Sequence, residues 1–230
     1  MTDASRPPAD PALVDLLVRA DVLSFGDFVT KSGRPTPYFA NFGNVRTGAH
    51  IAALGRLYAD RIAAVFPAGV DVVFGPAYKG IPLAVAAASA LAADHASDVG
   101  FAFDRKEAKD HGEGGSLVGH PLRDGDRVVI VEDVTTAGTS VRETIPKLRA
   151  VADVEVVGLV VGLDRRERGP SGDSSALDGL AEEFGLVGTS LATIEQVVEL
   201  LVGREIDGRV VLTAAHAERI TAHLAEHGPR

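Results

Sequence analysis

The stretch RVVIVEDVTTAGTS, residues 127–140, decides the fold expected for this chain. The run from Val128 to Val131 is short and β-branched, as is typical of a parallel-sheet strand that helices cover on both faces. Two carboxylates, Glu132 and Asp133, stand where that strand is expected to end. The segment 141–150 beyond them has a helix-compatible composition. The stretch therefore predicts a strand, a loop and a helix within an α/β sheet.

The loop between the carboxylates and the helix suits a phosphate. Its residues are small, hydroxylated or apolar: Val134, Thr135, Thr136, Ala137, Gly138, Thr139 and Ser140. Backbone N–H groups of a tight loop and of a helix N-terminus point at an anion, and a glycine permits close approach. The acidic pair would repel that phosphate, so we expect it to accept hydrogen bonds from ribose hydroxyls. An ordinary buried strand with a polar turn is the alternative.

Two common phosphate-binding loops are excluded, because neither GxxxxGK[ST] nor GxGxxG occurs in the chain. The whole run instead resembles the ribose-phosphate signature of the type I phosphoribosyltransferases, enzymes that use phosphoribosyl pyrophosphate (PRPP). Many members have two aspartates at the acidic pair, whereas this chain has Glu132 first. The resemblance implies a mostly parallel sheet flanked by helices, a small N-terminal hood, and ligands at the carboxyl ends of the strands.

Length and composition indicate one globular domain. The chain has 230 residues, 46% of them hydrophobic and 24% charged. We expect residues 1–11 to be a flexible N-terminus and 12–230 to form a single phosphoribosyltransferase domain, with the hood mainly in 12–48 and the core from about 49. No internal repeat or long linker divides the chain.

Charge and hydropathy exclude several partners. The net charge of −9 argues against a nucleic-acid partner, whose phosphates need cations. No apolar run approaches the ~20 residues of a membrane span, and the N-terminal residues lack a signal pattern, so we expect no membrane partner and a cytoplasmic location. With no cysteine, the chain has no disulfide and no thiolate chemistry.

Two further segments carry candidate ligands. A lone lysine in a turn is usually solvated, but TKSGRPTPYF, residues 30–39, resembles the hood over the base in the orotate phosphoribosyltransferases. The resemblance implies that Lys31 contacts ligand and Phe39 lies against the pyrimidine; Ala40 stands where the family often has a second phenylalanine. The loop GPAYKG, with Tyr78 and Lys79, is either a turn with a surface lysine or a pyrophosphate loop.

The charged run RKEAKDHGEGG, residues 105–115, is ordinarily a solvated loop. Its glycines supply hinges, and mobile cations closing over a pyrophosphate would stabilise the charge that develops on it as the C1–O bond breaks. The string also matches the catalytic loop of the orotate phosphoribosyltransferases. This match implies PRPP contacts from Arg105, Lys106, Lys109 and His111, and we expect the rate to depend most on Lys109.

The segment DRRERG, residues 164–169, follows another predicted strand, 156–163. It is either a strand end capped by ion pairs or, by the same resemblance, the source of an arginine for the substrate carboxylate; Arg165 is the positional match, and a guanidinium suits a carboxylate fork. Thr136 is also expected to contact orotate. The family implies homodimers with shared active sites, and Mg²⁺ held mainly through PRPP and water rather than by a protein cage.

Taken together, the resemblance implies transfer of the phosphoribosyl group from PRPP to orotate, giving orotidine 5′-monophosphate and pyrophosphate. Glu132, Asp133 and Lys109 are the expected catalytic residues. Two alternatives stay open: a type I phosphoribosyltransferase acting on a purine, and a non-catalytic regulator that senses PRPP. The 105–115 run and Arg165 argue against the purine, which has no carboxylate for an arginine.

Overall fold

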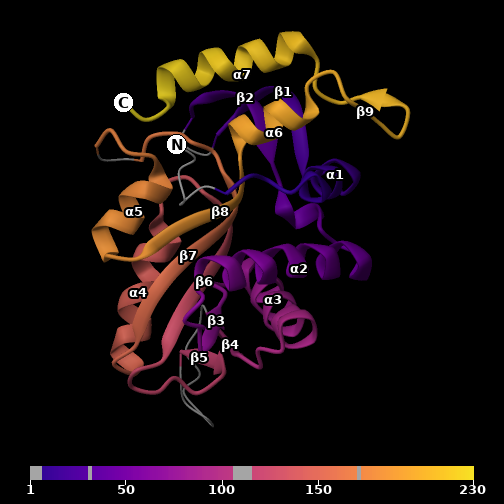
Figure 1. The fold of residues 1–230 in the computed structure, drawn as a ribbon. Helices are drawn as coiled ribbons and strands as arrows, with labels where there is room; N and C mark the ends of the chain where they lie inside the picture. The colour runs from indigo at the N-terminus through magenta and orange to yellow at the C-terminus, as the bar shows by residue number, and fades with distance from the viewer. Residues whose placement is uncertain (1–6, 31–32, 106–115, 170–171) are drawn as a thin grey trace.

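A computed structural model describes residues 7–30, 33–105, 116–169 and 172–230 (Figure 1). In this part of the chain the central sheet has the strand order β5-β4-β3-β6-β7-β8. Its strands are β3 (Val72–Phe74), β4 (Gly100–Asp104), β5 (Leu117–Gly119), β6 (Arg127–Thr135), β7 (Glu155–Asp164) and β8 (Val187–Thr193). All neighbours pair in parallel except β5, which pairs antiparallel with β4. The expected mostly parallel α/β sheet is confirmed.

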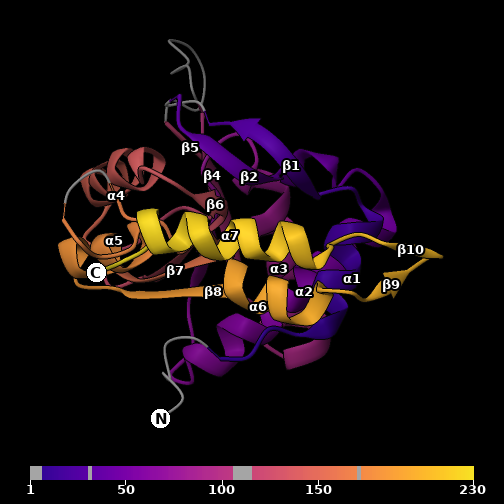
Figure 2. The same ribbon diagram turned by 90° about the horizontal axis from the view of Figure 1, so that it is seen from above.

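Helices cover both faces of this sheet (Figures 1 and 2). On one face lie α2 (Gly48–Val65) and α3 (Gly80–His95), and on the other lie α4 (Thr139–Val151) and α5 (Ala176–Phe184). Strand β6 contributes to both cores: Val129 and Val131 pack in the first, Val128 and Ile130 in the second. All four side chains are fully buried, as their sequence pattern predicts.

Strand β6 is longer than its apolar run. It continues to Thr135, so Glu132 and Asp133 lie inside the strand rather than after it. The cause is the neighbouring strand β7, since the parallel pairing continues as far as Val134 with Leu163 and Thr135 with Asp164. The expectation that the strand ends at the carboxylates is therefore wrong, because β6 continues two residues beyond Asp133.

A layer of N-terminal and C-terminal elements covers the carboxyl end of the sheet. It contains α1 (Pro11–Arg19), the antiparallel hairpin β1 (Leu23–Val29) and β2 (Pro35–Ala40), the short helix η1 (Phe42–Asn44), α6 (Ile194–Leu201) and α7 (Ala214–His227). A small ribbon of β9 (Glu205–Ile206) and β10 (Arg209–Val210) precedes α7. Figures 1 and 2 show α7 lying across the hairpin and α6. The hood expected from residues 12–48 thus lies beside the C-terminal helix.

No helix in the described residues combines the length and apolarity needed to cross a membrane.

Candidate active site

A cavity of about 760 Å³ lies at the carboxyl ends of β6 and β7. Its lining unites the acidic pair and the phosphate loop with two arginines from elsewhere in the chain: Arg34, Glu132, Asp133, Val134, Thr135, Thr136, Ala137, Gly138, Thr139, Ser140, Val141, Arg168 and Gly169. Open parallel sheets bind ligands at this edge.

The two carboxylates point to opposite faces of β6, because successive strand residues alternate. Asp133 faces the side of α2 and α3, and its Oδ2 accepts a hydrogen bond of 2.8 Å from Nζ of Lys79, at the start of α3. Glu132 faces the side of α4, where Ser140 Oγ lies 2.5 Å from its Oε1. Each carboxylate is thus held by a residue from the helix on its own face.

Burial raises the pKa of Glu132 to about 7; the neighbouring charge of Asp133 adds to this rise, and the hydrogen bond from Ser140 opposes it. Only 9% of Glu132 is exposed. Near neutral pH the side chain therefore exchanges between a neutral acid that donates a hydrogen bond and a carboxylate that accepts one. From the other face, the hydroxyl of Tyr58 donates to the Glu132 backbone carbonyl oxygen at 2.6 Å and fixes the strand at this point.

The phosphate loop turns at Gly138. Its φ of 71° is left-handed, and a Cβ there would lie 2.8 Å from the methyl groups of Leu180, so the position requires glycine. Among the residues that the structure describes, no side chain caps the helix α4 that begins at Thr139, so its first N–H groups are available to an anion. Nη1 of Arg142 donates to the Ala137 carbonyl at 2.5 Å and holds the loop from outside.

Asp104, the last residue of β4, connects the second loop to the same site. Its Oδ1 accepts from the Ala77 N–H at 2.7 Å, and its Oδ2 accepts from Lys147 Nζ of α4 at 3.0 Å. The Ala77–Tyr78 peptide bond is cis. Gly75 must be glycine, because an added Cβ would lie 2.0 Å from the Gly80 carbonyl oxygen. These contacts place Lys79 beside the acidic pair.

A buried polar cluster lies at the arginine side of the cavity, and we call it the Glu167 cluster. Its members are Arg34, Tyr38, Arg165, Glu167 and His223. Oε1 of Glu167 accepts from Arg165 Nη2 at 2.6 Å, the Tyr38 hydroxyl at 3.1 Å and His223 Nε2 at 3.1 Å. Its Oε2 pairs with Nη2 of Arg34. Burial would raise the pKa of Glu167, but the two guanidinium groups outweigh it and lower the pKa.

Both guanidinium groups in the cluster keep a buried donor. Nε of Arg34 and Nε of Arg165 have no hydrogen-bond partner among the described residues. The Arg165 guanidinium also lies 4.5 Å from the Tyr38 ring centroid, over the ring face. Buried donors are usually satisfied, so these two remain open to a group that the described residues do not supply.

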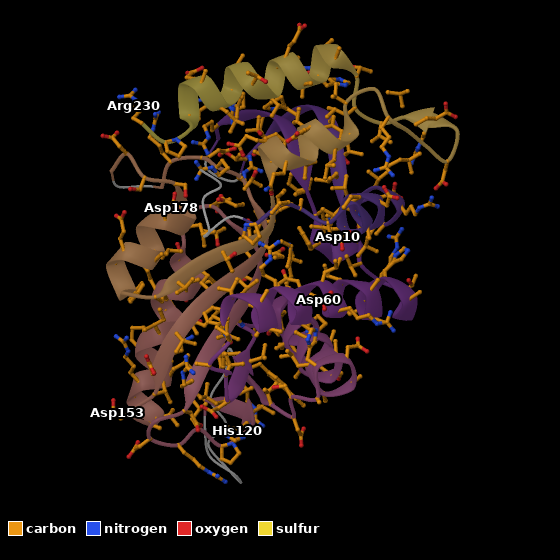
Figure 3. The ribbon with its side chains drawn as sticks, viewed as in Figure 1. Asp10, Asp60, His120, Asp153, Asp178 and Arg230 are labelled. Carbon is orange, nitrogen blue, oxygen red and sulfur yellow. The ribbon has the colours of Figure 1, made fainter. Side chains whose placement is uncertain are left out.

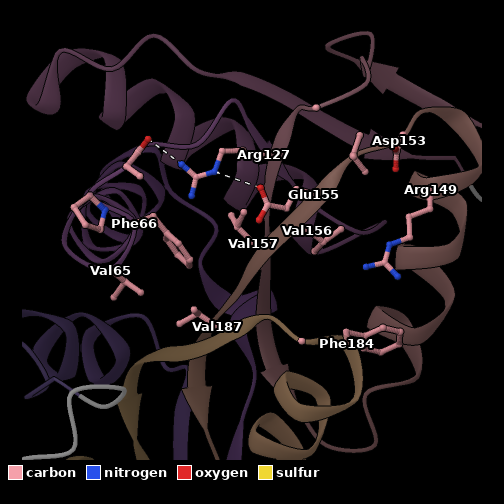
Figure 4. Close-up of a pocket in the computed structure, with 15 residues that line it drawn as sticks. Val65, Phe66, Arg127, Arg149, Asp153, Glu155, Val156, Val157, Phe184 and Val187 are labelled. Carbon is pink, nitrogen blue, oxygen red and sulfur yellow. Dashed lines mark hydrogen bonds and ion pairs between the residues drawn. The ribbon is translucent and has the colours of Figure 1, made fainter.

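A second cavity, of about 750 Å³, lies at the opposite end of the sheet (Figure 4). Its lining includes Arg127 and Arg149, and Arg127 is already paired with Glu155 and donates to the Ala68 carbonyl at 2.9 Å. Figure 3 shows the separation, with Asp153 and His120 at one end of the molecule and Asp178 and Arg230 at the other. The acidic pair and the phosphate loop are at the Asp178 end, which we take as the active site.

Known proteins match most of this chain in sequence and in fold. The phosphoribosyl transferase domain family matches residues 45–200. An orotate phosphoribosyltransferase of Clostridium beijerinckii is 47% identical over 217 residues, covering 94% of this chain and 96% of the relative. The chain belongs to the orotate phosphoribosyltransferases.

Two more members support this assignment. The orotate phosphoribosyltransferase of Bifidobacterium longum is 48% identical over 220 residues, which cover 93% of this chain and 95% of the relative. The crystal structure of the Francisella tularensis orotate phosphoribosyltransferase superposes with a TM-score of 0.79 at 32% identity, covering 94% of this chain and 99% of that chain. The prediction of family, fold and reaction from the sequence motifs is confirmed.

Within this family member, the structure brings together the acidic pair, the phosphate loop and Lys79, as expected. Four expected ligands, Lys31, Lys106, Lys109 and His111, lie outside the described residues. Arg105 is half-buried, and its backbone N–H donates to Ser116 at 2.8 Å. Their roles, and the individual roles within the phosphate loop, stay predictions.

The remaining candidate ligands are Tyr78, Phe39, Ala40 and Arg165. The Tyr78 side chain is 67% exposed. Phe39 is 44% exposed, and its ring stacks on Phe28 with centroids 5.8 Å apart; Ala40 beside it is partly exposed. Arg165 is only 5% exposed and is absent from the described residues that line the cavity. Their contacts with ligand also stay predictions.

Sequence reasoning did not single out five residues that the structure brings to the site: Arg34, Asp104, Glu167, Arg168 and His223. Four of them stand within or beside motifs that were recognised, since Arg34 lies in SGRP, Asp104 ends a strand, and Glu167 and Arg168 belong to DRRERG. That proximity is a usable signal. His223, in an amphipathic C-terminal helix, offers none.

Proposed function

We propose that the cavity beyond β6 and β7 is where this chain transfers the phosphoribosyl group of PRPP to orotate, giving orotidine 5′-monophosphate and pyrophosphate. The observation that carries the assignment is the joining of the acidic pair, a phosphate-sized loop and a free helix N-terminus in one cavity. Glu132 and Asp133 accept hydrogen bonds from the ribose hydroxyls, and the loop 134–140 binds the 5-phosphate.

The pyrophosphate would lie on the Lys79 side of the acidic pair. Lys79 Nζ is 2.8 Å from Asp133, which supports a role for its charge beside the leaving group as that group separates from C1. Arg105 and the expected cations Lys106, Lys109 and His111 would add to this charge from the 105–115 segment. A leaving pyrophosphate gains negative charge as the bond to C1 breaks, and cations held around it lower the barrier.

Mg²⁺ fits this arrangement as a partner of PRPP. The described residues contain no group of three or more histidine or acidic side chains able to hold a metal ion. Magnesium accepts one or two carboxylates together with phosphate oxygens and water, so Asp133 and Glu132 are the protein groups that would help to hold it. When bound, the ion would offset the charge of the pyrophosphate. We propose Mg²⁺ dependence on this basis.

Orotate would lie between the loop and the Glu167 cluster, within reach of Thr136, Phe39 and Lys31. Its carboxylate would pair with the guanidinium of Arg34, which lines the cavity, and, as the family resemblance implies, with that of Arg165. An oxocarbenium-like C1 is then attacked by the orotate ring nitrogen, and no covalent enzyme intermediate is required. A purine has no carboxylate, so it would leave these donors unpaired.

We also propose that a second copy of the chain covers the outer face of α2 and α3. This face carries a groove of about 600 Å³ lined mainly by apolar and small side chains, among them Ile51, Ile81, Pro82 and Val85. Apolar patches of this kind mark protein interfaces, and identical chains pair most often by twofold symmetry. The cytoplasmic location stays a prediction from the sequence.

The loss of orotate ultraviolet absorbance on addition of PRPP and Mg²⁺ tests the function, with adenine, guanine, hypoxanthine and uracil in parallel. We expect orotate alone to be consumed, and a chelator to stop the reaction. Turnover of a purine instead of orotate would overturn the base assignment and leave the PRPP site standing. PRPP binding without turnover of any base would favour the regulator.

A further inference from the structure

The C-terminal helix α7 is attached directly to the segment that borders the cavity. Arg168 donates its backbone N–H to the His227 carbonyl at 2.8 Å, and its guanidinium to the carbonyls of Gly228 at 2.9 Å and Glu226 at 2.6 Å. These bonds satisfy carbonyls at the end of the helix, which have no partner within it. In Figure 1 this end of α7, next to the label C, lies above α5.

One side chain of α7 continues this attachment into the Glu167 cluster. His223 is buried, and its Nε2 lies 3.1 Å from Oε1 of Glu167. Burial lowers the pKa of His223, so its imidazole is neutral at physiological pH and donates one N–H to the carboxylate. The ring packs edge-on against Tyr38, with centroids 6.3 Å apart. His223 thus fixes one oxygen of the acid that holds both arginines.

The single carboxylate of Glu167 binds two guanidinium groups. Arg165 binds Oε1 and Arg34 binds Oε2, so the rotation of the carboxylate sets the directions of both. Bidentate recognition by guanidinium groups depends on such geometry. Arg34 lines the cavity with its side chain partly exposed, whereas Glu167 and His223 are not among the residues that line it.

We propose that His223 is a positioning residue for the base. Through Glu167 it holds Arg34 and Arg165 in the orientation that receives the orotate carboxylate, so the C-terminal helix sets the affinity for orotate without touching it. Arg34 becomes a specificity-determining residue of the same site. This inference rests on the proposed function of the cavity.

The test compares His223→Gln with His223→Asn. The glutamine amide reaches the position of Nε2, and the asparagine amide is one bond too short, so only the first keeps the hydrogen bond to Glu167. We expect His223→Asn to raise the KM for orotate at least fivefold and to change the KM for PRPP less than twofold. His223→Gln should restore most of the orotate KM. His216→Ala, on the same helix but outside the cluster, should leave both KM values unchanged.

Two results would overturn the proposal: equal changes in both KM values, or equal orotate KM values for the Gln and Asn variants. A double variant gives a second measurement, since His223→Asn added to Glu167→Gln should change the orotate KM no further. Additive effects would show that His223 does not act through Glu167. If the wild-type protein turned over no orotate, the proposed function would fail. Calorimetric titration with orotate would then decide, and the same Kd for wild type and His223→Asn would reject the inference.

Discussion

Ser140 Oγ lies 2.5 Å from the carboxyl group of Glu132, across the loop that is expected to bind the 5-phosphate. The first residue of the acidic pair and the last residue of the phosphate loop are therefore one hydrogen-bonded unit. Because Glu132 is buried and beside Asp133, its proton affinity depends on this bond. The ribose and phosphate parts of the site are coupled at this point.

This coupling predicts a pH dependence for PRPP. Burial raises the pKa of Glu132 to about 7. We expect the ribose hydroxyls of PRPP to donate to the ionised form. Raising the pH from 6 to 8 should therefore lower the KM for PRPP by roughly tenfold, with no further fall above it. Steady-state rates across this range provide the measurement. The Glu132→Gln variant, which cannot ionise, should show a flat KM profile, and the same slope in both proteins would refute the explanation.

The protonation of Glu132 should also affect the free energy of unfolding. The folded-state pKa of Glu132 exceeds its unfolded value of 4.5, so the folded protein binds the proton more tightly. The contribution of this side chain to stability is greatest below pH 4.5 and is lost as the pH rises through about 7. Glu132→Gln should therefore gain up to about 3 kcal/mol relative to wild type at pH 8, and little at pH 4.5. Denaturant unfolding at the two pH values gives the comparison; an identical difference at both would contradict it.

Ser140→Ala should raise the KM for PRPP and leave the KM for orotate unchanged. Loss of the hydroxyl removes the bond that lowers the pKa of Glu132, so the KM for PRPP at pH 7 should rise roughly three- to tenfold. Ser140→Thr keeps a hydroxyl and serves as the control. Kinetics with PRPP and orotate varied separately would give the two KM values. An increased KM for orotate alone would show that Ser140 acts elsewhere.

Lys79→Ala should lower kcat by roughly a hundredfold, because the leaving pyrophosphate loses a cation placed beside the acidic pair. Its ion pair with Asp133 is half-exposed, so the free energy of unfolding should change by less than about 1 kcal/mol. Arg19→Ala is the matched control, since its half-exposed ion pair is with Asp207 and neither residue lines the cavity. A large loss of stability with unchanged kcat would assign Lys79 a structural role.

Gly138→Ala should damage both stability and PRPP binding. Its left-handed φ costs an alanine about 1–2 kcal/mol, and contact with Leu180 adds an overpacking cost of about 1–3 kcal/mol. Gly208 has a similar φ of 78° in open space, so Gly208→Ala should show the first cost only. Thermal melting and the KM for PRPP check both variants. Equal melting temperatures for the two would show that the contact with Leu180 relaxes freely.

Much of this protein was determined by local sequence. The apolar run before Glu132 specifies a strand buried on both faces, and the small polar residues after Asp133 specify a phosphate loop leading into a helix. These patterns act within a few residues, where alternation and turn chemistry operate. The family and the reaction were predicted from the resemblance of these and other motifs, above all the 105–115 run, to the orotate phosphoribosyltransferases. The local patterns did not determine the end of β6, which the pairing with β7 extends to Thr135.

Only the tertiary structure decided how the residues are arranged in the part of the site that is expected to bind the base. Arg34 and Glu167 are 133 positions apart, and His223 is 56 positions beyond Glu167, yet all three share one buried carboxylate. No local period connects them, because they meet only when α7 packs over the hairpin and the end of β7. Arg165 shows the same division: its motif predicts a ligand contact, whereas its orientation is set by Glu167 and Thr36. Sequence patterns specify residue types and local structure, and long-range packing specifies the direction in which a charged side chain points.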